Sequence, residues 1–474
     1  MSFDCNTIYT GKLKYRDIDF TFVFTGTELR LIPPADKESE IEWQWKMKSI
    51  GNGAYTFADP MPVDERYLTS HCNETNQRIV FLPAQGSTLS FNNTVVIIEI
   101  ESFIVCKSND DKFNRVTISC PEMNYIHPIN KAFTIKIPNE FAKEGVAYFN
   151  TQNFDLTTTD KQKFIVDEKE VQMYFGISRT ISHKIENPPL TLESVMFFEF
   201  DATNDYSFIL RLWQIARDFI RFLCYRNNIF ITKIDLSTSD DDGKYNNFAK
   251  MYINNRDEES EELPLQKGRY IKQIHIAGKE GDILSDIASD SIYLRHLPET
   301  FESGHHINAA RFVMITAAFE WEFRRLYPDG IKKSEATINA ENAVCEEIQK
   351  EIDNLSGKKK NIYKFLQRLV RSDSIQPKII QIGKDFSGIV DIFGKHLYRL
   401  NNQELDYSEM GERLASQRNN FAHGNLDKDF IGLSLLDLMF LEIVVYAMQL
   451  KFYEIDDVEI QKSINALFQQ RLAI

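Results

Sequence analysis

The spacing of the apolar residues changes along the chain, and this change constrains the fold more than any other feature of the sequence. Up to about residue 200, apolar and polar residues alternate in short runs, as in 18–24, 133–137 and 171–177. A period of two places the apolar side chains on one face of a β-strand. From about residue 305, apolar residues recur every three or four positions, as in 312–323, which indicates α-helices.

The fold class expected from this pattern is α+β and multidomain, because 474 residues suffice for two or three domains of roughly 100–200 residues each. We expect residues 1–200 to form a β-rich module, as an antiparallel sandwich or barrel. Residues 201–300 predict a mixed α/β connecting region that is either separate or part of the first domain. Residues 301–474 predict an all-α helical bundle, with 380–397 as one of its helices.

Composition restricts the expected partners and compartment. The formal net charge is −14, so any RNA contact must come from a local basic patch, and binding to anionic membranes is not expected. Six cysteines without a CxxC pair, and an N-terminus without an apolar signal-peptide core, predict a cytoplasmic protein. The most apolar run, 431–450, contains Asp437 and Glu442, which favours a buried bundle helix over a membrane span.

The most compact set of reactive side chains lies in Arg418–Gly424, just before that apolar run. RNA is cleaved when its own 2′-hydroxyl attacks the neighbouring phosphorus, which requires a base, an acid and a cation near the phosphate. His423 titrates near neutral pH and can act as base or acid. Arg418 is permanently charged and can hold a phosphate oxygen. The segment therefore holds the residue types that RNA cleavage requires.

The spacing of Arg418 and His423 sets a structural condition on this chemistry. Five residues of regular helix leave two side chains about 140° apart. They converge only if the helix ends between them, for which Gly424 is a suitable stop, or if a second copy of the motif supplies the missing partner. A structural origin is also open: His423 can satisfy carbonyls at a helix end, and Arg418 can pair with Glu412 or Asp427.

The segment Arg418–Gly424 and its flanking helices resemble the RNxxxH motif of the HEPN superfamily. A β-rich N-terminal half joined to such a C-terminal domain resembles ApeA-type anti-phage defence proteins. The resemblance implies that the bundle is a HEPN ribonuclease domain, usually dimeric, in which two motifs share one composite cleft. It also implies cleavage without a metal ion.

The resemblance carries specific roles to four residues of this sequence. Arg418 and His423 match the catalytic pair, and Asn419 matches the polar position after the arginine. The acidic residue on the family's first helix, followed by basic ones, corresponds to Glu320 with Arg324 and Arg325. An ordinary helical salt bridge between Glu320 and Arg324 explains that last match equally well.

A second candidate site is a basic stretch, 358–371, that contains six basic residues and no acidic one. Four of the basic residues recur at helical spacing and could bind RNA phosphates as one stripe: Lys360, Lys364, Arg368 and Arg371. The alternative is a solvated helix face paired with the acidic helix at 341–351.

No cofactor or metal site is expected from the sequence. His305 and His306 are adjacent, so their side chains point in different directions. Cys72, Cys106 and Cys120 lack the spacing of a standard zinc finger, which favours ordinary core cysteines, and whether they bind a metal stays open. Neither a glycine-rich phosphate loop nor a nucleophile elbow occurs.

Together these features give the hypothesis of a cytoplasmic, metal-independent endoribonuclease. The family resemblance implies anti-phage defence by cleavage of cellular RNA, with tRNA as one candidate substrate. It also implies a homodimer or higher homo-oligomer and an N-terminal module that senses a phage-derived trigger. Two alternatives are a non-catalytic HEPN-like interaction protein and an RNA-binding module that does not cleave.

Overall fold

The computed structural model describes residues 8–107, 112–136, 148–231, 233–254, 268–331, 333–371, 374–422 and 430–474. The chain divides into two compact units, each built from three separate segments. The first unit contains Met1–Arg221, Asn228–Glu262 and Glu280–Ser289. The second contains Phe222–Asn227, Leu263–Lys279 and Asp290–Ile474. The region 201–300 is thus shared between the two units.

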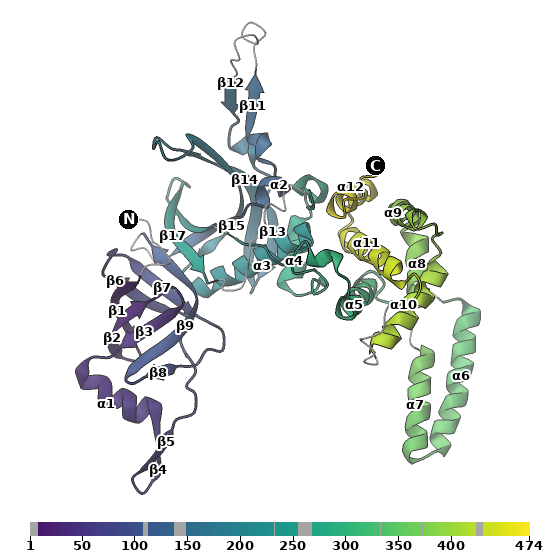
Figure 1. Cartoon of the computed structure of the whole chain (residues 1–474), viewed down its shortest axis with the longest axis horizontal. Helices are drawn as coiled ribbons and strands as arrows, with labels where there is room; N and C mark the ends of the chain where they lie inside the picture. The colour runs from purple at the N-terminus through teal and green to yellow at the C-terminus, as the bar shows by residue number, and fades with distance from the viewer. Residues whose placement is uncertain are drawn as a thin grey trace. The chain divides into compact units, whose positions relative to one another are not determined.

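Six strands in the described part of the first unit close into an antiparallel β-barrel (Figure 1). Their order is β1-β2-β3-β9-β7-β6, and β6 pairs again with β1. The strands are β1 (Tyr9–Tyr15), β2 (Ile18–Phe24), β3 (Glu28–Ile32), β6 (Leu68–Cys72), β7 (Arg78–Pro83) and β9 (Val95–Cys106). The alternation predicted in 18–24 is confirmed, because Ile18, Phe20, Phe22 and Phe24 of β2 are buried in the barrel core.

The long strand β9 also belongs to a second antiparallel sheet. Its first half pairs with β3, whereas Ser102–Cys106 pair with β17, and the sheet continues in the order β17-β16-β10-β15-β14-β13. These strands are β10 (Phe113–Ser119), β13 (Gln162–Val166), β14 (Lys169–Ile181), β15 (Leu190–Thr203), β16 (Lys233–Ser239) and β17 (Tyr245–Ile253). The alternation in 171–177 is confirmed, since the four apolar residues of that run are buried in β14.

Two helices of the first unit accompany this second sheet. Helix α3 (Tyr206–Cys224) places Phe208 against Phe200 of β15 and Phe219 against Phe175 of β14. Helix α4 (Glu280–Ala288) contacts β13. A Cβ atom at Gly281 would lie 2.6 Å from the Lys163 carbonyl oxygen, so a glycine is needed for this close approach.

Two hairpins of the first unit carry exposed apolar side chains. They are β4 (Met47–Gly51) with β5 (Ala54–Phe57), and β11 (Phe133–Lys136) with β12 (Tyr148–Thr151). The strand predicted by the alternation in 133–137 is present as β11, but the side chain of Ile135 is 60% exposed. In the described structure β11 pairs only with β12, so no second layer covers it; residue 137 lies outside the described residues.

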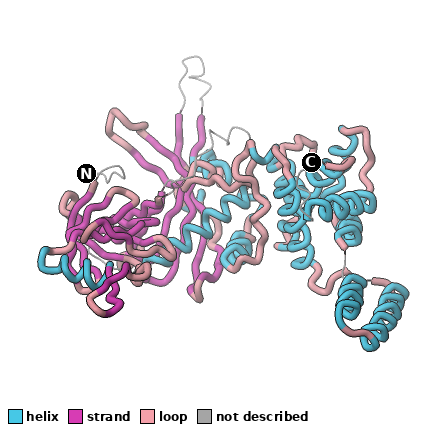
Figure 2. The backbone as a smooth tube through the Cα atoms, turned by 60° about the horizontal axis from the view of Figure 1, so that its bottom comes forward, coloured by secondary structure: helices cyan, strands magenta, loops and turns pink. Residues whose placement is uncertain are grey.

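Helices make up the regular structure of the second unit, as the cyan tube shows in Figure 2. Its helices of eight or more residues in the described part are α5 (Ala309–Leu326), α6 (Glu335–Asn354), α7 (Gly357–Arg371), α8 (Ile375–Asp385), α9 (Ser387–Leu400), α10 (Tyr407–Ala422), α11 (Ser434–Phe452) and α12 (Asp457–Leu467). The expected α+β combination of a β-rich part with a helical part is therefore confirmed at this level.

Helix α11 is the centre of the second unit. It contacts α5, α9, α10 and α12, and nearly all of its residues are buried. Asp437 and Glu442 lie within this buried helix, and each is paired with an arginine from another helix. The expectation of a buried bundle helix at 431–450 is thus confirmed. Among the described residues, no helix has both the length and the apolar character needed to cross a membrane.

The single helix expected at 380–397 is wrong, because the chain forms two helices there. Helix α8 ends and α9 begins around Phe386, which is buried. The Phe386 amide donates to Ile382, and the Phe386 carbonyl accepts from Ile389 and Val390. The backbone amide and carbonyl of Phe386 are therefore both hydrogen-bonded at the break. Burial of the Phe386 ring fixes the point at which α8 ends and α9 begins.

Candidate functional site

Helix α10 carries the first residues of the R-x4-H segment. Leu414 and Phe421 are buried on its inner side, and Gln417 is also buried. Arg418 lies at the edge of this buried face, with 36% of its side chain exposed. The buried neighbours therefore fix the helix while the guanidinium keeps access to solvent.

The Arg418 guanidinium forms a bidentate ion pair with Glu320 of α5. Arg418 Nη1 donates to Glu320 Oε1 and Nη2 donates to Oε2, both at 2.9 Å. Lys378 of α8 lies near the same carboxylate, with Nζ 3.7 Å from Oε1. Two cations thus surround one carboxylate, which leaves a local positive charge on a chain whose formal net charge is −14.

A buried ion pair holds α10 against α11. Arg413 donates from Nε to Asp437 Oδ2 at 2.7 Å and from Nη2 to Oδ1 at 2.9 Å, and the hydroxyl of Tyr398 on α9 also donates to Oδ1. Asp437 is fully buried, and its carboxylate raises the pKa of Arg413 further. Removal from solvent and the same carboxylate raise the pKa of Tyr398.

The described residues on either side of the histidine segment are held together. Phe421 and Phe430 pack against each other, with ring centroids 5.6 Å apart, and both contact Phe312 of α5. Gln417 Oε1 accepts hydrogen bonds from the Ile431 amide at 3.0 Å and from the Ser434 hydroxyl at 3.2 Å. These contacts tie the end of α10 to the start of α11. His423, Gly424 and Asp427 themselves lie outside the described residues.

The other residues suggested by the resemblance occupy different environments. Asn419 is exposed on α10. Arg324 Nε donates to the backbone carbonyl of Glu320 rather than to its carboxylate, so the helical salt bridge considered for this pair is not formed in this structure. Arg325 pairs instead with the buried carboxylate of Glu322. The alternative partner Glu412 accepts from Gln376 at 3.0 Å.

The basic stripe lies on α7, which packs against the acidic helix α6. Lys364 and Arg368 are exposed and Lys360 is half-buried. Within the described residues, no ion pair joins these three side chains to a carboxylate of α6. The side chain of Arg371 lies outside the described part of the chain. The stripe and the Arg418–Glu320 pair belong to the same unit.

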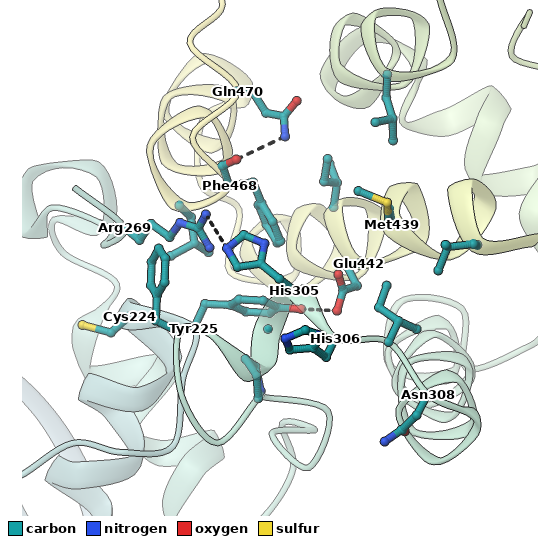
Figure 3. Close-up of a pocket in the computed structure, with 18 of the residues that line it drawn as sticks. Cys224, Tyr225, Arg269, His305, His306, Asn308, Met439, Glu442, Phe468 and Gln470 are labelled. Atoms are coloured by element: carbon teal, nitrogen blue, oxygen red, sulfur yellow. Dashed lines mark hydrogen bonds between the residues drawn. The ribbon is translucent and has the colours of Figure 1, made fainter. Parts of the chain in front are cut away.

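No group of three or more potential metal ligands occurs among the residues that the structure describes. Cys72, Cys106 and Cys120 are buried. The Cys72 thiol donates to Glu74 at 3.2 Å. His305 and His306 face a cavity between the start of α5 and α11 (Figure 3).

Two residues of the candidate site, Lys378 and Gln417, were not predicted from the sequence. Lys378 reaches Glu320 from a different helix, and Gln417 joins α10 to the start of α11. Both contacts depend on how separate helices pack. The contact of Lys378 with Glu320 therefore cannot be predicted from spacing along the sequence. A polar residue on the apolar side of a predicted helix, as at Gln417, could have indicated a structural hydrogen bond.

No protein-family model matches the chain, and no curated protein or solved structure shows significant similarity to it.

Proposed function

We propose that this chain is a metal-independent endoribonuclease of the HEPN type. The observation that supports the proposal best is the cluster of Glu320, Arg418 and Lys378, which gathers two cations around one carboxylate at the start of the R-x4-H segment. Such a cluster suits a phosphodiester, because cations stabilise the charge that develops on phosphorus during cleavage.

Glu320 is a positioning residue in this proposal. Its bidentate pair with Arg418 uses two of the five N–H groups of the guanidinium and fixes the plane of that group. The other N–H groups then bind a nonbridging oxygen of the scissile phosphate. Lys378 adds a second positive charge close to the same point. Asn419, exposed beside Arg418, orients the reacting groups.

His423 transfers the protons. As a neutral imidazole it takes the proton of the 2′-hydroxyl while the 2′-oxygen forms a bond to phosphorus. The bond from phosphorus to the 5′-oxygen breaks, and that oxygen receives a proton from an imidazolium. The products are a 2′,3′-cyclic phosphate and a 5′-hydroxyl. In a composite site of two chains, His423 of one chain transfers both protons beside Arg418 of the other chain.

The RNA contact extends from this site to the basic side chains of α7. Lys364 and Arg368 are exposed on α7. Lys360 precedes Lys364 by four residues and Arg371 follows Arg368 by three, so all four recur at helical spacing. Each neutralised phosphate makes binding weaker as salt rises, with a slope of roughly −0.7 per contact for a single strand. The stripe provides affinity, and tRNA is the first substrate to test.

The first unit supplies control in this proposal. Its β4–β5 and β11–β12 hairpins expose apolar side chains, including Ile50, Phe57 and Ile135. Exposed apolar clusters on a soluble protein are typical of contact surfaces for macromolecules. In this proposal a phage-derived protein binds one of these hairpins in the cytoplasm and thereby starts RNA cleavage. Cleavage of cellular RNA would then serve anti-phage defence.

The test is to map RNA ends from cells that express the wild-type chain or His423→Ala. We expect new fragments with 2′,3′-cyclic phosphate and 5′-hydroxyl ends in the wild type alone, and the same cleavage by purified protein in EDTA. The fragments also identify the substrate class. Identical RNA from the two strains, with equal amounts of folded protein, would contradict nuclease activity.

A non-catalytic interaction protein is the second candidate, and one observation favours it. The Arg418–Glu320 pair joins α10 to α5, so it also suits a purely structural role. A related alternative is an RNA-binding module without cleavage. In that case the charge reversal Lys364→Glu with Arg368→Glu abolishes RNA binding, His423→Ala leaves binding intact, and no protein of the set yields cut RNA.

A further inference from the structure

A well-defined cavity in the second unit has no role in the proposed nuclease function. Its volume is about 480 Å³, within the range of roughly 300–1,000 Å³ typical of small-molecule sites. Three parts of the unit form most of its walls: the segment before α5, the first half of α11, and the end of the chain after α12; Tyr225 and Arg269, from earlier in the chain, also line it. Figure 3 shows side chains from all three converging on the same space.

A neutralised ion pair forms one wall of the cavity. The Glu442 carboxylate accepts from the Tyr225 hydroxyl at 2.5 Å and from Arg311 Nη2 at 2.6 Å. Arg311 Nη1 also donates to the carbonyls of Ser303 and Gly304, which fixes the segment before α5. Because Arg311 compensates Glu442, this wall contributes no net charge to the cavity.

The backbone at Tyr225 is strained in a way that supports a binding role. Its φ angle is +54°, a left-handed conformation that bulky residues rarely adopt. Such strain persists where the surroundings fix the residue, and it occurs preferentially at ligand sites. Here it turns the tyrosine ring toward Glu442 and against Phe468, with ring centroids 4.9 Å apart.

The opposite side of the cavity is basic. Arg269 lies over the ring of Phe301, 3.7 Å from its centroid, and donates to His305 Nε2 at 3.3 Å. Arginine can only donate, so His305 Nε2 accepts in this arrangement. His306 lines the same side. Arg269, His305 and His306 bring N–H groups to this side of the cavity, and N–H groups suit the oxygens of a phosphate.

Aromatic rings line the cavity between its basic and neutral walls. Tyr225, Phe301, Phe430 and Phe468 all contribute to the lining. Flat rings bind planar groups by stacking, which is worth about 1–3 kcal/mol for each nucleobase. Gln470 lies at the edge of this aromatic region, where its Nε2 donates to the Phe468 carbonyl at 3.2 Å and its Oε1 can accept from the edge of a base. An unbranched acyl anion would use the basic side but neither the rings nor the amide.

From this arrangement we infer that the cavity binds a mononucleotide, with its phosphate at Arg269, His305 and His306 and its base among the aromatic rings. This inference does not depend on the proposed RNA cleavage. It assigns the second unit a separate small-molecule site.

A bound nucleotide would also contact the end of α10. Phe430 lines the cavity and packs against Phe421, which follows Arg418 by three residues. Ligand binding should therefore slow amide hydrogen exchange in 417–422 and 430–435. No such change is expected in the barrel strands of the first unit.

The test is calorimetric titration of the full-length chain with AMP, GMP, CMP and UMP, and with the matching nucleosides, ribose 5-phosphate and decanoate. We expect at least one mononucleotide to bind about tenfold or more tightly than its nucleoside and ribose 5-phosphate. Met439→Trp should abolish this binding, because Met439 lines the cavity and is 42% exposed, so a larger side chain fills the space without disturbing the core. Leu435→Trp, at a second exposed lining position, should act likewise.

Two arginine variants separate phosphate recognition from general charge. Arg269→Ala should weaken mononucleotide binding about tenfold or more and leave nucleoside binding unchanged. Arg399→Ala removes an exposed arginine of α9 that does not line the cavity, and it should leave binding unchanged. The melting temperature of each variant reports whether it is folded. The inference fails if no mononucleotide binds at millimolar concentration, if folded Met439→Trp and Leu435→Trp bind as the wild type does, or if decanoate alone binds.

Discussion

A substitution at Glu320, which forms a bidentate pair with Arg418, should change RNA cleavage much more than folding stability. Both side chains are partly solvent-exposed, at 22% and 36%, so the pair should contribute no more than about 1 kcal/mol to folding. If Glu320 positions the guanidinium for phosphate, Glu320→Gln should reduce RNA cleavage about 100-fold, because small misplacements of a catalytic group have effects of this size. Cleavage rates and thermal unfolding of the same protein measure both quantities.

Glu412→Gln is the matched control for this variant. Glu412 is an exposed glutamate of α10 that accepts from Gln376 and does not contact Arg418. Its neutralisation should change neither cleavage nor stability measurably. Equal cleavage by Glu320→Gln and the wild type would exclude the positioning role and leave the ion pair as a tie between α5 and α10.

His296 predicts a loss of stability in mild acid. The ring is buried among Tyr225, Tyr293 and Tyr446, and burial together with the nearby Arg311 lowers its pKa to about 3. In the unfolded chain the pKa returns to about 6.5. Between these values the unfolded state binds a proton that the folded state does not, so stability falls as the pH falls, by up to about 1.4 kcal/mol per pH unit.

His296→Phe should remove this component of the pH dependence. Phenylalanine fits the aromatic surroundings and does not titrate, so the variant should lose about 2 kcal/mol less than the wild type between pH 6.5 and 4.5. Chemical unfolding at a series of pH values measures the difference. His183→Phe, at an exposed position, should follow the wild-type profile. Parallel profiles for His296→Phe and the wild type would contradict the prediction.

At the scale of elements, one buried ion pair anchors α10 on α11. Arg413→Ala would leave the Asp437 carboxylate buried without its cation, which typically costs about 3–5 kcal/mol. Hydrogen exchange of the α10 and α11 amides reports the stability of these helices separately from the first unit. We expect faster exchange in both helices.

Glu409→Gln provides the control for that measurement. Glu409 is the other ion-pair partner of Arg413, and its side chain is 70% exposed. Loss of this exposed pair should cost less than about 1 kcal/mol. Similar exchange in the two variants would mean that the buried pair does not anchor α10.

The sequence predicted elements well where a buried face has a regular period. Strands β2 and β14 and helix α5 follow from the spacing of their apolar residues, because each packs one continuous face into a core, whereas α11 follows from its long apolar run, because most of its residues are buried. The exposed alternation at Ile135 could not be recognised, since period two is the same whether or not a second layer covers the strand. The break at Phe386 was missed because packing of a buried ring sets it.

The candidate site followed only partly from the sequence. Spacing identified Arg418 and His423 as a pair, and a family resemblance pointed to Glu320. The contact between Glu320 and Arg418 joins residues 98 positions apart, and Lys378 enters from a third helix. Such contacts depend on how helices pack. Spacing within one helix therefore cannot predict them.

At the scale of the molecule, the two units cannot be separated by a single cut in the chain. Phe222–Asn227 belong to the helical unit although they continue α3 of the first unit. Within the helical unit Phe222 stacks on Tyr446, with ring centroids 5.3 Å apart, and Tyr225 bonds Glu442. A domain boundary placed near residue 300 would assign the two partners of each of these contacts to different domains. The periodicity of apolar residues predicts where helices and strands lie, but it does not predict which core each of them packs into.

The assembly of the whole protein determines how Arg418 and His423 meet, and mixed subunits can test it. If each active site of a homodimer takes Arg418 from one chain and His423 from the other, Arg418→Ala and His423→Ala are inactive alone. Their mixture contains about half heterodimers, each with one intact site of two, so about a quarter of wild-type cleavage should return. Subunits must be exchanged by co-expression with two different tags, followed by purification through both.

The doubly purified heterodimer should retain about half of the wild-type activity per dimer. A mixture of Arg418→Ala with the double variant Arg418→Ala/His423→Ala is the control, since no arrangement of these chains contains an intact pair. An inactive heterodimer in the presence of active wild-type dimer would show that both residues act within one chain. Because five residues of regular helix leave the two side chains about 140° apart, that result would also require the helix to end before His423.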